Sequence, residues 1–321
     1  GILKLGVELK LSSPVTDVDA LKAQGFKAVF LATGAHKGLK LGVSGERLKG
    51  VLDGVTFLRD VNLGKPIKVG EKVAVIGGGN VAIDAARTAL RLGAREVQIF
   101  YRRLKEDMPA APWEIAEAEK EGIQLHYLVA PGQMWGGNGG VKRMQCRRMT
   151  LSEFDASGRK RPTAIAGSEF EVEIDTVIAA VGQIPDTECF RGNGFQFDSS
   201  GAFRVDPDTL ATGTPGVFAG GDNVRGPASA VEAMADGQKA AMAIDRYLGG
   251  DGRMPNAFRD QLKGLKVSFD EEAYAEEHPR IEMPTLPLSD RYHNFKEVEL
   301  GYSARMAVEE AKRCLHCYRQ E

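Results

Sequence analysis

The chain has 321 residues, of which 43% are hydrophobic, and this is enough for two domains of ordinary size. The formal net charge of −2 gives no electrostatic argument for binding nucleic acid or an anionic membrane surface. No apolar run is long enough to cross a bilayer, and the four cysteines argue against a disulfide scaffold. We therefore expect a cytoplasmic protein without a membrane span.

The N-terminal part of the sequence predicts two strands with a helix between them. The strands are expected at residues 7–11 and 29–32, and the helix at residues 17–24. Thr33 and Gly34 follow the second strand in a turn of small residues. The opening Gly-Ile-Leu-Lys-Leu-Gly-Val-Glu is not an initiator sequence, so we expect a fragment or a processed chain.

The strongest single signal is a glycine-rich turn between a strand and a helix. Residues 73–76 form a short apolar run that is typical of a buried parallel strand. Gly77, Gly79 and Ala82 follow at the Gly-x-Gly-x-x-Gly/Ala spacing, which gives a tight turn, room for a pyrophosphate and close helix–strand packing. A helix starting near Asn80 directs its unpaired N–H groups and positive dipole end at the phosphates. The candidate contacts are Gly77, Gly79, Asn80, Val81 and Ala82.

The next strand indicates which dinucleotide is bound. A strand is predicted at residues 97–101, and an NAD site usually has Asp or Glu at the end of this strand to hold the ribose 2′-hydroxyl. Arg102 and Arg103 stand there instead. A guanidinium suits a 2′-phosphate through charge and paired hydrogen bonds, so the sequence favours NADPH over NADH. The alternative is that both arginines form a solvated strand end.

The rest of the chain continues the alternation of strands and helices. A helix is predicted at residues 112–121, a β-rich excursion at 140–175 and an apolar strand at 176–181 that leads into Gly182. Residues 217–222 form another apolar strand followed by Gly-Gly-Asp, and a long helix is predicted at about 228–248. A last helix, predicted at 305–315, leads into Cys314-Leu-His-Cys317.

The order of these segments resembles the flavoprotein reductases with two dinucleotide-binding domains. It is most similar to the family of the small (beta) subunit of NADPH-dependent glutamate synthase and its iron–sulfur-linked relatives. The resemblance rests on residues 32–34, the glycine turn, 101–103, 180–185, 214–222 and the alanine-rich helix after them. It implies an α/β fold in which a Rossmann-like NAD(P)H domain is inserted into a partial FAD domain. The implied boundaries are 1–65 and 183–250 for FAD, 66–182 for NAD(P)H, and 251–321 for a C-terminal tail.

The resemblance also implies residues for FAD. Asp222 would hydrogen-bond a ribitol hydroxyl, Gly221 would allow close approach, and the helix carrying Ala230 and Val231 would direct its N-terminus at the flavin. Thr33 and Gly34 would lie near the pyrophosphate, and Gly182 would lie where the nicotinamide stacks. The family's N-terminal FAD glycine turn is missing from this sequence. FAD is therefore expected in the parent protein and is left open for this chain alone.

Cys314 and Cys317 match the start of a family motif beside iron–sulfur ligands. A [4Fe–4S] cluster needs four thiolates, and the two remaining cysteines, Cys146 and Cys189, lie far along the sequence. A cluster remnant is one interpretation. A redox dithiol, half of a zinc site and two idle thiols are the others.

The leading hypothesis is an NADPH-dependent oxidoreductase, similar to the glutamate synthase small subunit. It would pass hydride from NADPH to FAD and electrons on to iron–sulfur centres of a large catalytic or iron–sulfur partner subunit. No catalytic side chain is predicted, because the two cofactors do the chemistry and the protein orients them. The alternative is a nucleotide-binding module of a larger redox complex that has no turnover alone.

Overall fold

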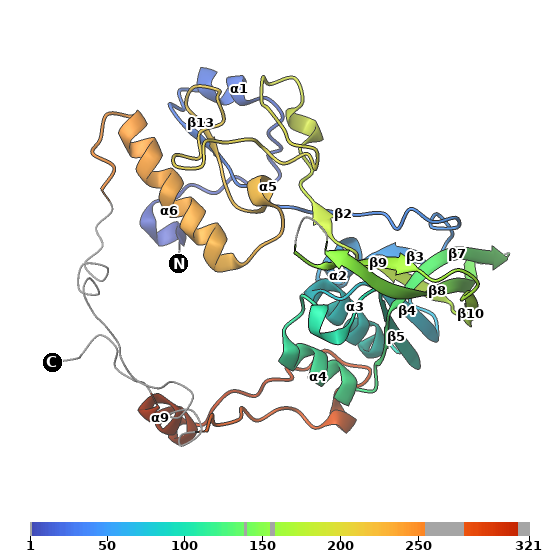
Figure 1. The fold of residues 1–321 in the computed structure, drawn as a ribbon. Coiled ribbons are helices and arrows are strands. Elements are labelled where there is room, and N and C mark those ends of the chain that lie inside the picture. The colour runs from blue at the N-terminus through green and yellow to red at the C-terminus, as the bar shows by residue number, and fades with distance from the viewer. Residues whose placement is uncertain (1, 138–139, 155–157, 254–278, 314–321) are drawn as a thin grey trace. The chain divides into compact units, whose positions relative to one another are not determined.

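The computed structural model describes residues 2–137, 140–154, 158–253 and 279–313. The chain divides into two compact units (Figure 1). We call residues 1–39 and 182–254 the first unit, and residues 40–181 and 255–321 the second unit. The chain thus leaves the first unit after Leu39 and returns to it at Gly182.

A five-stranded parallel sheet forms the centre of the second unit. Its order is β3 (Val51–Asp53), β11 (Thr176–Ala179), β4 (Lys72–Ile76), β5 (Glu96–Tyr101) and β6 (Gln124–Tyr127). The strands are rich in Val and Ile, and β4 and β5 are buried almost throughout. This pattern is expected where both faces of a parallel sheet are covered.

Three helices cover one face of this sheet. They are α2 (Gly54–Asn62), α3 (Asn80–Arg91) and α4 (Pro112–Lys120). Val73 and Val75 of β4 pack with these helices, whereas the alternating Ala74 and Ile76 belong to the core on the opposite face, as the two-residue period of a strand requires. The predicted strand, glycine turn and helix starting at Asn80 are confirmed.

An antiparallel sheet packs on the opposite face. It contains β7 (Val129–Gly137), β8 (Gly140–Phe154), β9 (Lys160–Ala164) and β10 (Phe170–Glu173). Met134, Val141 and Met144 of this sheet join Ile76 and Phe100 in one buried cluster. The predicted β-rich excursion is confirmed, but β9 was not predicted, because Lys-Arg-Pro-Thr-Ala lacks an apolar pattern and becomes a strand by pairing with β8.

The first unit has small sheets and one long helix. β1 (Val29–Leu31) pairs in parallel with β13 (Val217–Ala219), and β2 (Lys37–Gly38) pairs antiparallel with β12 (Gln183–Ile184). The helices are α1 (Val18–Ala23), α5 (Asp222–Arg225) and α6 (Ala230–Tyr247). The core joins Leu31, Val217 and Ala219 to a group of phenylalanines. The described residues also include α9 (Ala304–Lys312) of the second unit, and the 3₁₀ helices η1 (Ile2–Leu5), η2 (Lys105–Asp107), η3 (Glu188–Phe190) and η4 (Leu288–Asp290).

The strand predicted at residues 7–11 is wrong. Val7, Leu9 and Leu11 alternate as a half-buried strand would, but their side chains are exposed and this segment pairs with no strand of the described residues. A strand needs partners for its backbone N–H and C=O groups, and an alternating pattern alone does not provide them.

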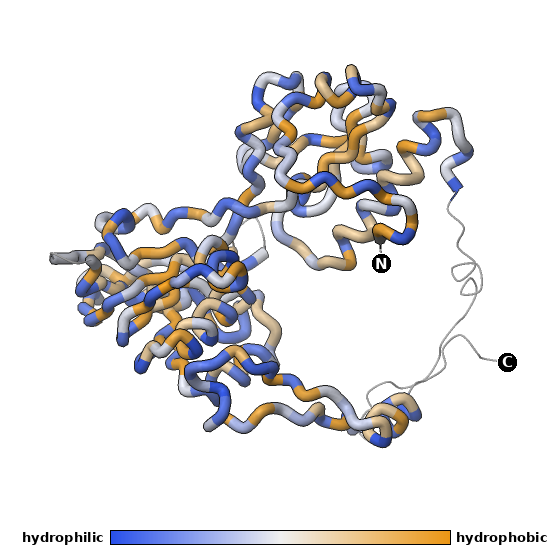
Figure 2. Tube along the Cα trace, turned by 180° about the vertical axis from the view of Figure 1, so that it is seen from behind, coloured by the Kyte–Doolittle hydropathy of each residue, from blue (hydrophilic) through white to orange (hydrophobic). Residues whose placement is uncertain are grey.

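Part of the C-terminal region packs against α4 within the second unit. Arg291 donates hydrogen bonds to Glu117 of α4 and to Glu121, and the Tyr292 hydroxyl donates to the Glu121 carbonyl. Figure 1 shows this segment running alongside α4. Among the described residues, no helix combines the length and the hydrophobicity that crossing a membrane requires, and Figure 2 shows hydrophobic and hydrophilic residues mixed along the trace.

Candidate functional site

The glycine turn between β4 and α3 is shaped by two different constraints. Gly77 has a φ of +145°, and a Cβ there would stand 2.1 Å from the Ala180 carbonyl oxygen. A Cβ on Gly78 would stand 2.6 Å from the ring of Tyr101. The fold itself therefore excludes a side chain at both positions.

Gly79 differs from its two neighbours. Its φ of −92° and ψ of 179° are ordinary extended values, and a Cβ there would meet only Pro109 Cγ, at 3.9 Å. The protein has room for a side chain at this position, so the neighbouring protein atoms do not require glycine. No side chain caps α3 at Gly79, and Ala82 behind the turn is fully buried. A backbone that is open at a 12-residue helix start fits a phosphate group.

Gly79→Ala tests this interpretation directly. We expect the free energy of unfolding to change by about 0.5 kcal/mol or less, because the backbone conformation suits alanine. We expect the dissociation constant for NADPH to rise about tenfold or more, because the new methyl group would occupy the space in which the sequence motif predicts the pyrophosphate. Titration calorimetry measures the binding. Gly237→Ala, within α6 and with no atom near the added Cβ, is the control that should leave binding unchanged.

The two arginines after β5 have different environments. Arg102 is exposed, whereas Arg103 is buried and only 4% exposed. The Arg103 Nε donates to the Lys160 carbonyl at 3.0 Å. Arg103 is therefore packed under β9, whereas Arg102 is exposed at this strand end.

Gly182 lies at the boundary of the two units. Its φ is +126°, and its carbonyl accepts a hydrogen bond from the Leu39 N–H at 2.9 Å. It belongs by its contacts to the first unit, together with β2 and β12.

Asn223 connects two of the candidate FAD segments of the first unit, the end of β1 and the turn after β13. This side chain is fully buried, and its Nδ2 donates to the Leu31 carbonyl at 2.9 Å and to Thr33 Oγ1 at 3.3 Å. It joins the end of β1 to the turn of Gly221, which has a φ of +77°, and Asp222. The structure thus brings Thr33 and Gly34 close to the turn after β13.

Asn223 Oδ1 is buried and has no hydrogen-bond partner among the described residues. A buried acceptor without a donor is unfavourable, so a ligand donor at this turn would satisfy it. Asp222 Oδ1 accepts from the Ala228 N–H at 3.3 Å, and Val231 at the start of α6 is 68% exposed. These features fit a polar ligand lying over the turn and the start of α6.

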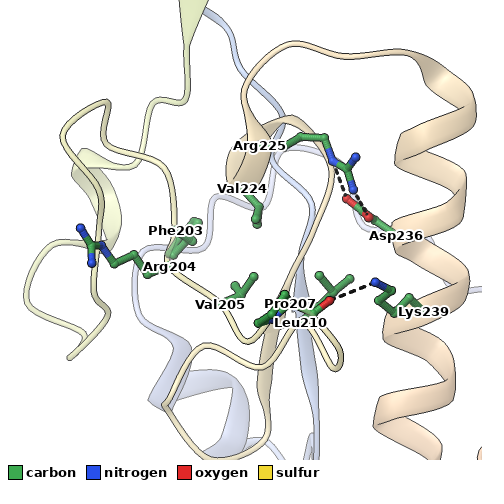
Figure 3. A pocket seen from close by; sticks show the side chains of 9 residues that line it. All are labelled: Phe203, Arg204, Val205, Pro207, Leu210, Val224, Arg225, Asp236 and Lys239. Carbon is green, nitrogen blue, oxygen red and sulfur yellow. Dashed lines mark hydrogen bonds and ion pairs between the residues drawn. The ribbon is translucent and has the colours of Figure 1, made fainter. Parts of the chain in front are cut away.

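Asp236 is a further residue of this turn that the sequence did not reveal. It is buried, and its Oδ2 accepts from the Gly221 N–H at 2.8 Å. Arg225 donates to both of its carboxylate oxygens, as Figure 3 shows. The only sequence signal is an aspartate within an alanine-rich helix. The ion pair borders a cavity of about 480 Å³, whose lining also includes Phe203, Leu210, Val224 and Lys239.

The helix that carries Ala230 and Val231 starts two residues later than expected. Ser229 is its N-cap, and Glu232 completes a reciprocal capping box. This cap satisfies N–H groups of the first turn with the protein's own side chains.

The cysteines that the structure describes give no metal centre. Burial raises the pKa of the Cys146 thiol to about 12, so it is inert, and Cys189 is an exposed single thiol. In the described ranges no three His, Cys, Asp or Glu side chains are grouped closely enough to hold a metal ion. Cys314 and Cys317 lie outside the described residues, and their role stays a prediction.

Comparisons with curated proteins give three informative relatives. The chain is 43% identical to NADP(+)-dependent formate dehydrogenase subunit beta of Moorella thermoacetica, over 99% of this chain and 46% of that protein. It is 39% identical to NADPH-Fe(3+) oxidoreductase subunit beta of Geobacter sulfurreducens, over 92% of this chain and 49% of that protein. It is 35% identical to the glutamate synthase (NADPH) small chain of Escherichia coli, over 76% and 56%. The chain spans about half the length of these relatives.

Solved structures and a family model agree with these relatives. FprA from Mycobacterium tuberculosis in complex with NADPH has a TM-score of 0.61 at 21% identity, covering 83% of this chain and 73% of that chain. Thioredoxin reductase of T. acidophilum has a TM-score of 0.53 at 26% identity, covering 69% and 65%. The predicted fold class and the predicted resemblance are confirmed. The family model described as pyridine nucleotide-disulphide oxidoreductase matches residues 6–237, and the chain therefore belongs to this family.

Proposed function

We propose that this chain is the NADPH-docking part of a flavoprotein oxidoreductase subunit. In this proposal NADPH binds the second unit at the turn between β4 and α3, and FAD binds the first unit. The observation that carries it is Gly79, because the residue is glycine although the neighbouring protein atoms leave room for a side chain. Three relatives with different names share NADP(+) or NADPH in those names.

The coenzyme contacts in the proposal are the ones that the glycine turn offers. The pyrophosphate lies over Gly77 and Gly79, with N–H groups of Asn80, Val81 and Ala82 directed at it. Arg102 binds the 2′-phosphate, and Gly182 belongs to the nicotinamide end. These residues hold and orient the coenzyme, and none of them transfers a proton.

FAD fits the turn that Asn223 organises. Thr33 and Gly34 would lie on the pyrophosphate side, and Gly221 and Asp222 on the ribitol side. Ala230 and Val231 would lie at the flavin edge, where the start of α6 contributes a positive dipole. Bound FAD would accept the hydride that NADPH donates.

The electron acceptor that follows the flavin is the most specific part of the proposal. The relatives are a formate dehydrogenase beta subunit, an iron(III) oxidoreductase beta subunit and a glutamate synthase small chain, so the partner subunit sets the acceptor. The same proposal includes an iron–sulfur partner subunit in the cytoplasm. This subunit would receive single electrons, and Cys314 and Cys317 would lie next to it. A nucleotide-binding module without turnover alone is the second candidate, since the chain spans about half of its relatives.

Arg102→Ala should separate NADPH from NADH. We expect the dissociation constant for NADPH to rise about thirtyfold and that for NADH to change less than about twofold, because only NADPH carries the 2′-phosphate. Equal effects on both coenzymes would remove the phosphate role from Arg102. Arg95→Ala is a matched control, because Arg95 is an exposed arginine paired with Glu71 at the opposite end of β5.

A visible absorption spectrum tests the FAD part. The purified chain is incubated with FAD, passed through gel filtration and mixed with NADPH without oxygen. Retained flavin bands that bleach on NADPH support the reductase. A colourless chain that still binds NADPH in calorimetry supports the nucleotide-binding module, and a chain that binds neither contradicts both candidates.

A further inference from the structure

Tyr101 connects the glycine turn to the end of β5. Its ring lies against Gly78, where a Cβ would stand 2.6 Å from two ring carbons. Its hydroxyl donates to the Asp107 carbonyl at 2.7 Å. Tyr101 is 7% exposed, so its position is fixed on both sides, and Arg102 and Arg103 leave the strand directly after it.

Arg103 holds the β8–β9 hairpin, of which the structure describes residues 140–154 and 158–164, against this strand end. Its buried guanidinium donates to the Lys160 carbonyl at 3.0 Å. Its own carbonyl accepts from the Leu128 N–H at 3.1 Å, and the Leu128 carbonyl accepts from the Met149 N–H at 2.7 Å. Arg103 therefore contacts the hairpin through β9 directly and through β8 by way of Leu128.

Arg159 precedes Lys160 and is exposed. Burial raises the pKa of the Tyr101 hydroxyl, while the positive charges of Arg103 and Arg159 act in the opposite direction. The residue that follows Arg159, Lys160, is the one whose carbonyl accepts the hydrogen bond from Arg103 Nε at 3.0 Å. Arg102 and Arg159 each directly precede one partner of this hydrogen bond, so the backbone brings two exposed arginines to the same strand end.

We propose that Arg159 joins Arg102 in binding the 2′-phosphate of NADPH, and that Arg103 is the positioning residue that fixes the hairpin carrying Arg159. The inference rests on the proposed function, because it needs the coenzyme on the glycine turn. A phosphate monoester has three oxygens and carries close to two negative charges at neutral pH, so a second guanidinium strengthens its binding. Arg159, which directly precedes β9, is then part of the coenzyme site.

The test uses the whole chain with 2′,5′-ADP and 5′-AMP, two ligands that differ only in the 2′-phosphate. Titration calorimetry gives both dissociation constants. Arg159→Ala should weaken 2′,5′-ADP about tenfold and leave 5′-AMP within about twofold. The matched control is Arg143→Ala, which removes an exposed arginine of the same antiparallel sheet that pairs with Glu171. It should change neither constant.

The positioning role is tested by coupling. Arg103→Lys keeps the charge but loses the planar fork that reaches Lys160. It should lower the ratio of 2′,5′-ADP to 5′-AMP affinity, and Arg159→Ala added to it should cost less than Arg159→Ala alone. A purely structural Arg103 would weaken both ligands together, or leave the two substitutions additive. Either of these results would remove the positioning role.

The outcomes separate this inference from the proposed function. A wild-type chain that binds 2′,5′-ADP no more tightly than 5′-AMP contradicts the NADPH proposal itself. A wild-type preference that survives Arg159→Ala overturns only the role of Arg159. Inorganic phosphate, titrated alone, tests whether Arg159 belongs to a general anion site. If Arg159→Ala removed phosphate binding but left 2′,5′-ADP binding unchanged, the proposed role of Arg159 would also be overturned.

Discussion

Replacing Glu121 by glutamine is expected to lower the free energy of unfolding by about 3–5 kcal/mol. The Glu121 side chain is 2% exposed and accepts hydrogen bonds from Arg87, Arg91 and Arg291. Removing its charge leaves three guanidinium groups around a neutral amide in a buried site, which is far more destabilising than losing a surface ion pair. Trp113 and Trp135, both in the second unit, report the unfolding in urea through their fluorescence.

Glu119→Gln is the matched control for this substitution. Glu119 also accepts hydrogen bonds from a cation, Lys105, but its side chain is 40% exposed. An exposed ion pair contributes about 1 kcal/mol or less. If the two variants lost equal free energy of unfolding, burial and the three arginines would add nothing to the contribution of Glu121 to stability.

The same carboxylate predicts a dependence of stability on pH. Burial acts to raise the pKa of Glu121, but hydrogen bonds from Arg87 and Arg91 outweigh it and lower the pKa from 4.5 to about 2. The stabilisation is then complete above pH 4.5, the pKa of this carboxyl in the unfolded chain. It is lost as the pH falls from about 4.5 toward 2, which lowers the free energy of unfolding by about 3 kcal/mol. Glu121→Gln should remove this part of the slope, since the amide does not titrate.

Gly77→Ala is expected to destabilise the second unit by about 3 kcal/mol or more. The added Cβ would stand 2.1 Å from the Ala180 carbonyl oxygen, at a φ of +145° that alanine rarely adopts. Relief of the contact would move β11 away from β4, because Ala180 directly follows β11. Thermal unfolding followed by tryptophan fluorescence measures the loss.

Gly64→Ala separates the two causes of that loss. Gly64 has a φ of +71°, but no atom lies within 4 Å of the added Cβ, so we expect a loss of about 1 kcal/mol from the backbone conformation alone. A Gly77→Ala loss no larger than this would mean that the close approach of Ala180 does not constrain the turn.

Sequence patterns predicted the elements whose structure depends on near neighbours. The apolar run of β4, the glycine turn and the start of α3 lie within a few residues of one another, and the pattern there describes both the local structure and its burial. β9 becomes a strand only through its pairing with β8 and was missed, and the strand predicted at residues 7–11 is wrong because this segment has no partner strand among the described residues. An alternating pattern indicates which face a strand would bury, but it does not indicate whether a partner exists.

The sequence did not reveal three buried polar residues, Asn223, Asp236 and Arg291, for a related reason. Asn223 and Asp236 are buried by contacts with Leu31, Thr33 and Arg225, and Arg291 is buried by α4, which lies far earlier in the chain. Buried polar side chains are the informative exceptions to composition rules, and only the tertiary structure identifies them. The different roles of Arg102 and Arg103 likewise depend on a hairpin more than 50 residues away in sequence.

The packing of the C-terminal segment has a mechanical consequence. A pull on α9 is transmitted to the segment before it, because Glu310 accepts from the Ile281 N–H at 2.9 Å and Tyr302 donates to the Ile281 carbonyl at 2.6 Å. From there Arg291 passes the load to Glu121, and Glu121 passes it to Arg87 and Arg91 in the last two turns of α3. A tensile force applied at the C-terminal end would therefore act along the helix whose first turn faces the proposed coenzyme site, before it acts on the strands.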